Sequence, residues 1–582
     1  EPVDSNGGTG NVIPDDTAGT GQTDDGGTGP VIPDDTAGTG QTDDGGTGNV
    51  IPDDTAGTGP TDTGGTGPTD TGGTGPTDTG GTGPTDTGGT GTGGTDPVDD
   101  CSRTSDPATG DPIVDAALEL QTKTSEVICR QWLLNPDRKN ALGLLSSYYN
   151  QGLPGDPSQS VPVDSNVGSS LSRCYIYDFG VLLEDYIVPN FDDLNSQEID
   201  EILTQVEILL TLQNIDNTWD SAYGNSGGVE MPMLGPLAKL GQGLLLLSEK
   251  IEDAGLVIQI QNAVQNLVNA IMGNAVSPSA WTLSVPHQTT TYTVYRQTPY
   301  SDDFANPEEN SRFAQLLLSL YDLNTASNMV YLRAAEDIFS AWARYTGADA
   351  ATFAFDPNGL PVWSLANWEG AEGQVEFRKL AHRLYYNYSD AIQPETQSLL
   401  DALFTAEWVL SNDTWTNATW GVDNVTYNWS VNPGETTTTI SHALLKQFHA
   451  DGLEHNELMP VWTELTGNNA SALLDSSEFA VEEGYPDIAD TLYAEAGNSV
   501  LTLNNLCSPE FGLPAIIGPE GFGQTAQWPY PGTPYIYMPL AHHVDNAYAW
   551  NAANSLIRLR YSGFIDSLQP SSSQAELLSS AA

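Results

Sequence analysis

The sequence predicts an all-α domain built from helical hairpins, preceded by an extended arm that has no core of its own. From about Asp111 onward, apolar residues recur with a period of about 3.6, which is typical of amphipathic helices. Residues 1–100, by contrast, contain no Lys, no Arg and no aromatic residue. Because a chain needs apolar side chains to offset the entropy lost on folding, only the later part can form a packed domain.

The first hundred residues consist of two sets of repeats. The sequence Val-Ile-Pro-Asp-Asp-Thr starts at Val12 and returns every 19 residues, and from Pro60 the unit Pro-Thr-Asp-Thr-Gly-Gly-Thr-Gly returns every eight. Gly raises the entropic cost of regular structure and Pro removes a backbone donor, so these repeats favour neither a helix nor a central strand. We therefore expect an extended, self-repelling arm over residues 1–100.

The eight-residue repeats place Thr beside Pro and Gly, a composition typical of O-glycosylated extracellular stalks. The threonines that we expect to carry glycans are Thr61, Thr63, Thr66, Thr69, Thr71, Thr74, Thr77, Thr79 and Thr82. Asp pairs in the arm, such as Asp15-Asp16, offer the oxygen ligands that Ca²⁺ prefers, but without the spacing of a known calcium loop. Solvated acidic residues are the favoured interpretation, Ca²⁺ is the weaker alternative, and we expect no metal site or other cofactor.

Segments with the helical period follow one another through the rest of the chain. They are Ile113–Leu133, Tyr175–Val188, Ser196–Leu212, Gly235–Asp253, Val257–Met272, Pro307–Asn324, Met329–Tyr345, Gly373–Tyr386, Pro394–Leu410, Thr438–Asp451, Tyr485–Leu503 and Ala541–Tyr561. Asp111 and Pro112 are start residues for the first of them. The β-branched and aromatic run Thr289–Tyr295 predicts one short strand. We divide the chain into the arm, a helical domain over 101–565 and a Ser/Ala-rich tail over 566–582.

Two of these segments resemble a known architecture. Tyr175–Leu183 (YIYDFGVLL) opens one predicted helix, and Gln213–Tyr223 (QNIDNTWDSAY) follows the next. They resemble the Tyr-Asp inner helix and the Gln-x-x-Asp-Gly-x-Trp loop of (α/α)6 six-hairpin barrels of the glycosidase and polysaccharide-lyase type, with Asn217 in place of the loop glycine. Glu309–Tyr321 resembles another inner helix of such a barrel, and Tyr331–Glu336 resembles its outer partner.

This resemblance extends over about residues 110–565 and implies that any catalytic carboxylates lie in a cleft at one end of the inner helices. Glycoside hydrolysis needs two carboxyl groups, and the candidate catalytic residues are Asp178, Glu369, Glu372, Asp545 and His543. Rings that could stack on sugars are Trp363, Trp368, Trp528 and Tyr530. Because acidic residues are so abundant, a carboxylate near a Trp arises easily by chance, and the leading interpretation assigns no catalytic residue.

The composition excludes several classes of function. The chain has 18 Lys and Arg against 77 Asp and Glu, a formal net charge of −59. Such a chain is a poor partner for nucleic acid or for anionic lipid, because both require a basic surface. The sequence contains neither the roughly 18–20 consecutive apolar residues of a membrane span nor a Gly-x-Ser-x-Gly elbow, phosphate loop or dinucleotide fingerprint.

Cysteines and glycosylation sequons favour a secreted protein. Four cysteines allow three pairings, of which we favour Cys101–Cys129, tying the arm to the first helix, and Cys174–Cys507, tying early and late parts of the barrel. A removed signal peptide would explain the start at Glu1. Asn-x-Ser/Thr sequons predict N-glycosylation at Asn387, Asn412, Asn417, Asn424, Asn428 and Asn469.

The leading functional hypothesis is a secreted, glycosylated structural protein, a subunit of an extracellular filament or surface assembly. In this assembly the arm contacts further copies of the chain, because an arm that lacks a core can find backbone hydrogen-bond partners in a neighbouring subunit. The helical barrel is then a head that carries glycans. The alternative is a secreted carbohydrate-active enzyme, either a glycoside hydrolase or a polysaccharide lyase. A carbohydrate-binding pseudoenzyme with a glycosylated linker is a further possibility.

Overall fold

The computed structural model describes residues 101–149, 173–345, 370–404 and 461–564 with short gaps, together with a few short strands between residues 421 and 446. The predicted arm, its O-glycosylation sites and its Asp pairs lie outside the described residues, as does the C-terminal tail. None of the helices in the described part of the chain combines the length and the apolarity that a membrane span needs.

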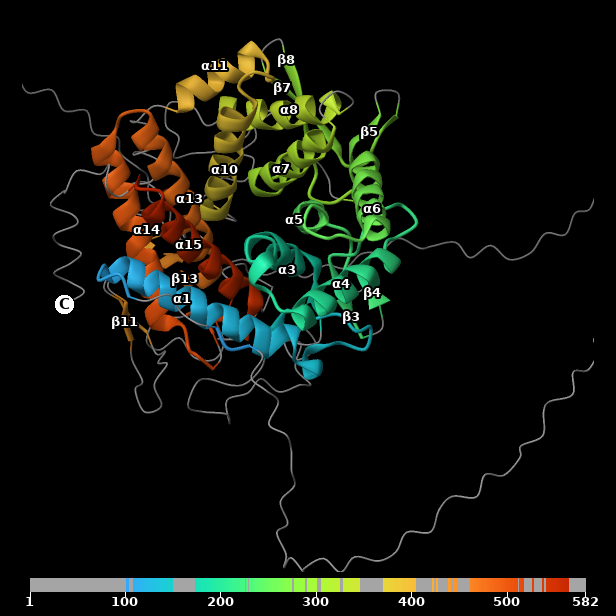
Figure 1. The fold of residues 1–582 in the computed structure, drawn as a ribbon. Coiled ribbons are helices and arrows are strands. Elements are labelled where there is room, and N and C mark those ends of the chain that lie inside the picture. The colour runs from blue at the N-terminus through green and yellow to red at the C-terminus, as the bar shows by residue number, and fades with distance from the viewer. Residues whose placement is uncertain are drawn as a thin grey trace, which may run out of the picture. The chain divides into compact units, whose positions relative to one another are not determined.

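The described helices form two concentric rings (Figure 1). The inner helices are α3 (Ile176–Val181), α5 (Leu234–Ser248), α7 (Pro307–Leu323), α10 (Gly370–Tyr388), α13 (Thr463–Glu482) and α15 (His543–Tyr561). The outer helices are α1 (Pro112–Ile128), α4 (Ser196–Thr211), α6 (Ala254–Met272), α8 (Met329–Tyr345), α11 (Pro394–Leu403) and α14 (Pro486–Leu506). Inner and outer helices alternate along the chain, so each hairpin contributes one helix to each ring.

The rings close on themselves. Each inner helix contacts the next one along the chain, and α15 packs against α3 and against the π-helical turn η4 (Leu182–Ile187) that continues α3. In the outer ring, α1 lies beside α14 and α15, which brings the first and last helices of the domain together (Figure 1). The all-α, (α/α)6-type barrel predicted from the sequence is confirmed, and within the described residues the barrel is closed.

Glycines allow the inner helices to approach one another closely. A Cβ on Gly180 would lie 2.5 Å from the backbone of Lys239 in α5, and a Cβ on Gly467 would lie 2.9 Å from the backbone of Tyr548 in α15. Real Cβ atoms do not come this close to backbone, so only glycine fits where α3 crosses α5 and where α13 crosses α15. The centre of the barrel is therefore narrow, and side chains at the starts of these helices are forced together.

Strands are short and lie in the loops. The predicted strand at 289–295 is confirmed as β8 (Thr290–Tyr295), which pairs antiparallel with β7 (Thr282–His287). The predicted helix Thr438–Asp451 is wrong, because this segment contains β11 (Thr438–Ile440) and β12 (Leu444–Lys446). Thr438 and Thr439 at its start end a run of four threonines, and such β-branched residues favour an extended backbone over the helix that the later apolar spacing suggested.

The remaining strands are two or three residues long. They are β1 (Tyr148–Tyr149), β2 (Cys174–Tyr175), β3 (Ala222–Gly224), β4 (Gly227–Gly228), β5 (Gly273–Asn274), β6 (Ser277–Pro278), β9 (Gly421–Val422), β10 (Val425–Tyr427), β13 (Val461–Trp462), β14 (Ile516–Ile517), β15 (Ala526–Gln527), β16 (Ile536–Tyr537) and β17 (Ala541–His542). Three of them lead directly into inner helices: β2 precedes α3, β13 precedes α13 and β17 precedes α15. Strand β2 pairs with β3, β13 pairs with β12 and β14, and β17 pairs with β1. These pairings fix the position of the chain where each of the three helices begins.

Helix α13 has no counterpart among the predicted helices. Sixteen of its twenty residues are buried, and many of these are polar, including Glu464, Asn468 and Asn469. A helix that is buried on nearly every face needs no apolar stripe, and its polar residues face a polar barrel interior. The periodicity that reveals surface helices is therefore absent from this segment.

One of the two favoured disulfides is present. Cys101 and Cys129 are bonded, with their Cα atoms 5.6 Å apart, so the predicted link between the chain before the first helix and the end of α1 is confirmed. The Cys174–Cys507 pairing is wrong, because both residues are buried free thiols. Cys174 lies in β2 at the start of an inner helix, whereas Cys507 ends the outer helix α14, so the two belong to different layers of the barrel.

Candidate active site at the start of the inner helices

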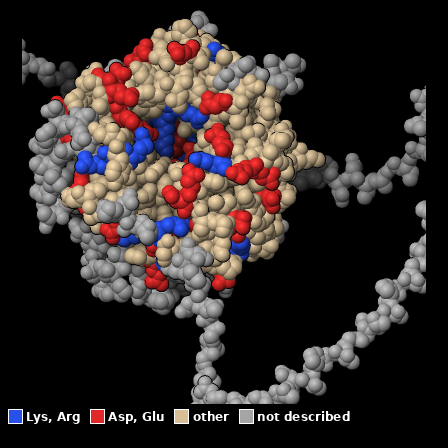
Figure 2. All heavy atoms as spheres, in the orientation of Figure 1, with Lys and Arg blue, Asp and Glu red and all other residues tan. Residues whose placement is uncertain are grey.

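Charged and aromatic side chains from the first two turns of five inner helices meet near the barrel axis. They come from five helices and from the strand before the last of them: Tyr177 and Asp178 of α3, Glu308, Glu309 and Arg312 of α7, Glu372 and Glu376 of α10, Glu464 and Asn468 of α13, and His542, Asp545 and Tyr548 at the start of α15. Most of them are buried. The face of the molecule shown in Figure 2 is hollowed near its middle, with Lys and Arg side chains inside the hollow and Asp and Glu around it.

The Tyr177 hydroxyl is the hub of this cluster. It lies 2.9 Å from Glu464 Oε1 and 3.1 Å from Glu372 Oε1, and it accepts a hydrogen bond of 2.8 Å from Arg312 Nη2. The phenol has a single proton, so it can donate to only one of the two carboxyl groups. The other contact is satisfied when that carboxyl is itself protonated and donates to the phenol oxygen.

The two glutamates on this hydroxyl have different electrostatic surroundings. Glu372 forms an ion pair with Arg312. Among the described residues, Glu464 forms no ion pair with a Lys or Arg. Burial raises the pKa of Glu464 well above the ordinary value, the charges of Glu372, Asp545 and Asp178 raise it further, and His542 only partly opposes this shift. The arrangement therefore places a carboxyl group paired with a guanidinium and a carboxyl group with a raised pKa on the two sides of Tyr177, as in an acid–base pair.

A charged histidine lies next to this pair. His542 Nε2 is 3.0 Å from Asp178 Oδ2, and its Nδ1 is 2.9 Å from Asp545 Oδ2. Although burial disfavours the imidazolium, these two carboxylates raise the pKa of His542 to about 10, so the ring is charged at neutral pH. The ring also stacks on Tyr148, with centroids 4.3 Å apart. Asp178, His542 and Asp545 thus form a hydrogen-bonded group near Glu464.

The structure brings together three of the catalytic candidates named from the sequence. Asp178, Glu372 and Asp545 all lie in the cluster, whereas Glu369 and the rings Trp363, Trp368, Trp528 and Tyr530 lie outside the described residues. His543 is adjacent but does not take part in the hydrogen bonding of the cluster: burial lowers its pKa to about 3, and its ring meets the edge of Trp132. Its neighbour His542 holds the carboxylates instead, because β17 directs that side chain toward α3.

Sequence reasoning missed three residues that define the site: Tyr177, Arg312 and Glu464. Tyr177 and Arg312 stood in segments that resembled inner helices, and their polar character on an otherwise apolar helix was the available indication. Glu464 could not be found, because α13 itself was not predicted. The position of Glu464 at the start of an inner helix is visible only in the folded chain.

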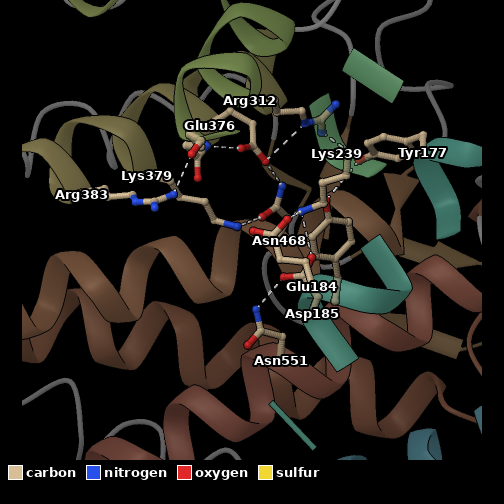
Figure 3. Close-up of polar contacts among 12 residues, drawn as sticks. Tyr177, Glu184, Asp185, Lys239, Arg312, Glu376, Lys379, Arg383, Asn468 and Asn551 are labelled. Carbon is tan, nitrogen blue, oxygen red and sulfur yellow. Dashed lines mark hydrogen bonds and ion pairs between the residues drawn. The ribbon is translucent and has the colours of Figure 1, made fainter. Parts of the chain in front are cut away.

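The polar cluster continues along the barrel axis (Figure 3). Arg312 also pairs with Glu308, and its Nε lies 3.7 Å from Glu376 Oε1. Asn468 donates to Glu376 with a length of 3.0 Å and accepts from Lys379. Although burial opposes its charged form, nearby Lys379, Arg312 and Lys239 lower the pKa of Glu376 to about 2. The buried carboxylate of Glu376 is therefore matched by buried cations.

A second ion-pair group lies deeper on the same axis. Lys239 of α5 is 2.9 Å from Glu184 and 3.0 Å from Asp185, which also accepts a hydrogen bond from Asn551 of α15. The ammonium lies 5.3 Å from the centre of the Tyr548 ring. A buried lysine is retained in its charged form by this pairing. This group joins η4, α5 and α15 and holds the closing seam of the barrel.

Glu309 makes the stability of the domain depend on pH. Burial, followed by the charge of Glu308, raises the pKa of Glu309 to about 8. Since the unfolded chain releases this proton near the ordinary carboxyl pKa, the stabilisation is complete below about pH 4.5 and is lost as the pH rises toward 8. We expect Glu309→Gln to remove that dependence and to be more stable than the parent at pH 8 by the order of 3–5 kcal/mol. Urea unfolding between pH 5 and 8 measures the difference.

The matched control is Glu308→Gln, one residue earlier in α7. Glu308 forms an ion pair with Arg312, so removing its charge leaves that buried guanidinium with less compensation. We expect this variant to be less stable than the parent at pH 7, opposite in sign to Glu309→Gln. Equal pH dependence in the Glu309→Gln variant and the parent would contradict the assignment of a neutral Glu309.

The sequons fall into three groups. Glycosylation of Asn469 is not expected in the folded chain, because its side chain is buried in α13 and accepts a hydrogen bond of 2.7 Å from Arg378. Asn387 is exposed near the end of α10, and its glycosylation stays a prediction. Asn412, Asn417, Asn424 and Asn428 lie outside the described residues. Among the residues that the structure describes, no group of His, Cys, Asp and Glu has the arrangement of a metal site.

Comparison with known proteins gives fold-level likenesses only. No family model matches the chain, and no curated protein matches its sequence. Among solved structures, cellobiose 2-epimerase from Spirochaeta thermophila is 11% identical over 78% of this chain and 100% of that chain, with a TM-score of 0.49. Glucoamylase from Saccharomycopsis fibuligera is 10% identical over 79% of this chain and 98% of that chain, with a TM-score of 0.48. At these identities the likeness concerns the fold alone.

Proposed function

We propose that the barrel is a carbohydrate-active enzyme that hydrolyses glycosidic bonds, with Glu464 as the acid and Glu372 as its charged partner. The observation that carries this proposal is the shared contact of both glutamates with the Tyr177 hydroxyl, one of them beside Arg312 and the other with a raised pKa. Glycoside hydrolysis needs two carboxyl groups of this kind, one protonated and one ionised.

The spacing of the two glutamates favours retention of configuration. Glu372 Oε1 and Glu464 Oε1 both contact one hydroxyl, at 3.1 and 2.9 Å, so they are at most about 6 Å apart. This suits the roughly 5–5.5 Å of retaining enzymes better than the roughly 6.5–9.5 Å of inverting ones. Glu464 would protonate the leaving oxygen while the Glu372 carboxylate bonds to the anomeric carbon. Water then releases the sugar and returns its proton to Glu464.

A screen of neutral polysaccharides, oligosaccharides and aryl glycosides tests this proposal. We expect release of reducing sugar from at least one of them, with the same anomeric configuration in the first product as in the substrate, followed by NMR. Glu372→Gln should abolish that release. Failure of every substrate, or a first product of inverted configuration, would count against the assignment of the two glutamates.

A lyase is the second enzymatic candidate, because Tyr177 beside Arg312 has the residue types of a phenol base and a cation that neutralises a uronate. Burial raises the pKa of Tyr177 well above its ordinary value even though Arg312 opposes the shift, so the phenolate is hard to form. The abundance of carboxylates around the site also disfavours an anionic sugar. Unsaturated products from a uronate polymer would favour the lyase.

Secretion and assembly form a separate part of the proposal. The Cys101–Cys129 disulfide suits an oxidising compartment such as the extracellular space. The repeat arm remains the reason to propose that copies of the chain join into a filament, with the enzymatic barrel as a head. Electron microscopy of the native material and of a chain that lacks residues 1–100 tests this. We expect filaments only with the arm, and separate particles in both samples would overturn assembly without affecting the enzyme.

A further inference from the structure

A second cavity lies between α7, α10 and α13, away from the proposed catalytic glutamates. Its volume is about 450 Å³, and it is lined by Gln315, Lys379, His382, Arg383, Tyr386, Asn387, Asp475, Glu478, Phe479 and Glu482. Along α10 the lining begins at Lys379 and ends at Asn387, whereas Glu372 lies in the first turn. With a rise of about 1.5 Å per residue, Tyr386 is roughly 21 Å further along the helix than Glu372. Most of the lining is therefore remote from the glutamate pair, and Lys379, which donates to Asn468, lies between the cavity and the candidate active site.

The charges of the lining residues are largely neutralised within the protein. Arg383 donates to Ser319 and to Asp322, and Glu478 pairs with Arg558 at 3.2 Å. Lys379 donates to Asn468. Neither an excess of positive charge for an anion nor an open carboxylate cluster for a metal ion is left among the described residues, so the cavity suits a neutral ligand.

Two further groups offer hydrogen bonds without a fixed charge. Burial raises the pKa of Asp475 to about 6, so its carboxyl group changes between donor and acceptor near neutral pH. Burial also lowers the pKa of His382 to about 3, which keeps its ring neutral. His382 Nε2 contacts Ser476 at 3.1 Å, while its buried Nδ1 has no hydrogen-bond partner among the described residues. A ligand rich in hydroxyl groups can use such mixed donors and acceptors.

An aromatic face completes the cavity. The Tyr386 ring stacks against His382 with an interplanar angle of 8°, and the residue remains 41% exposed. Flat aromatic surface beside several hydrogen-bonding groups is the combination that binds the apolar face and the hydroxyl groups of a sugar ring. We propose that this cavity is a second binding site, for a neutral saccharide, separate from the glutamate pair.

The ligand can come from two sources that share this chemistry. One is a free mono- or oligosaccharide. The other is the chain's own N-glycan, because the predicted sequon Asn387 lies at the cavity itself, exposed on the last turn of α10. A glycan on this residue would place its first sugar units directly at the cavity.

Binding measured directly tests the site, independently of any catalysis. The full chain, produced without glycosylation, is titrated by calorimetry with glucose, mannose, N-acetylglucosamine and their β- and α-linked disaccharides. We expect one of these sugars to bind, and Tyr386→Ala and Asp475→Leu each to weaken that binding at least tenfold. Tyr561→Ala is the matched control, since Tyr561 is 63% exposed at the end of α15 and does not line the cavity. It should bind as the parent does.

A variant of the active site separates this proposal from the proposed function. Tyr177→Phe should leave saccharide binding at the cavity unchanged, even if hydrolysis is lost or was never present. Binding that disappears with Tyr177→Phe but survives Tyr386→Ala would show that the sugar occupies the glutamate site, and would overturn the second site. Absence of binding by every sugar, or preferential binding of the polycation spermidine, would overturn it as well.

The same titration with protein from a glycosylating host distinguishes the two sources. If the Asn387 glycan occupies the cavity, free saccharide should bind only to the unglycosylated chain and to Asn387→Gln, and endoglycosidase should remove that glycan slowly. If free saccharide is the ligand, the glycosylated chain should bind it with unchanged affinity.

Discussion

Replacing Arg312 by methionine is expected to destabilise the barrel by about 3–5 kcal/mol, because it leaves buried carboxylates without their cation. Arg312 is 5% exposed and pairs with Glu308, Glu372 and Glu376, which come from two inner helices. Methionine keeps most of the apolar stem of the arginine side chain. The loss of stability therefore reports the removal of the positive charge rather than a change in side-chain volume. Urea unfolding at pH 7 measures the difference in the free energy of unfolding.

The pH dependence gives this prediction a second readout. The pKa of Glu376 is lowered to about 2 in the folded chain, so its ion pairs stabilise the fold above about pH 4.5 and lose that effect as the pH falls toward 2. The difference in the free energy of unfolding between the parent and Arg312→Met should therefore be largest at pH 7 and smaller in acid. Arg558→Met is the control, because the Arg558–Glu478 pair is exposed and should be worth at most about 1 kcal/mol. Equal losses in the two variants would contradict the role given to Arg312.

Glu464→Gln is expected to lower the rate of hydrolysis by about 10²–10⁴-fold on sugars whose leaving group needs a proton. The amide is close in shape to the protonated carboxyl that burial favours at this position, so the fold should hold while the proton donor is lost. Aryl glycosides with an acidic phenol as leaving group need no such proton, and their first step should be much less affected. Rates on the two kinds of substrate measure the contrast.

Glu372→Gln is the matched comparison for that prediction. It removes the charge that would bond to the anomeric carbon, so both kinds of substrate should fail equally. Because Glu372 also pairs with Arg312, its unfolding curve must be recorded beside the rates. If Glu464→Gln slowed both kinds of substrate to the same extent, Glu464 would not be the proton donor.

The sequence by itself determined the helical class and most helix positions. Amphipathic outer helices such as α4 and α6 present one apolar face to the inner ring, so a period of about 3.6 finds them. Capping residues set their starts, as Asn195 does for α4 and Asp253 for α6. The Cys101–Cys129 disulfide was also predicted, as a bond that ties the chain before the first helix to that helix.

Only the tertiary structure decided which residues form the site. Asp178, Glu372 and Asp545 were three carboxylates among many until ring closure brought the starts of α3, α10 and α15 to one end of the barrel. Helix α13 and its Glu464 were not predicted, because a helix surrounded by a polar interior has no apolar stripe. The contrast between the two glutamates at Tyr177 comes from the ion pair with Arg312 on one side and from burial on the other. Local pattern fixes local structure, whereas burial and charge at a site depend on residues hundreds of positions apart.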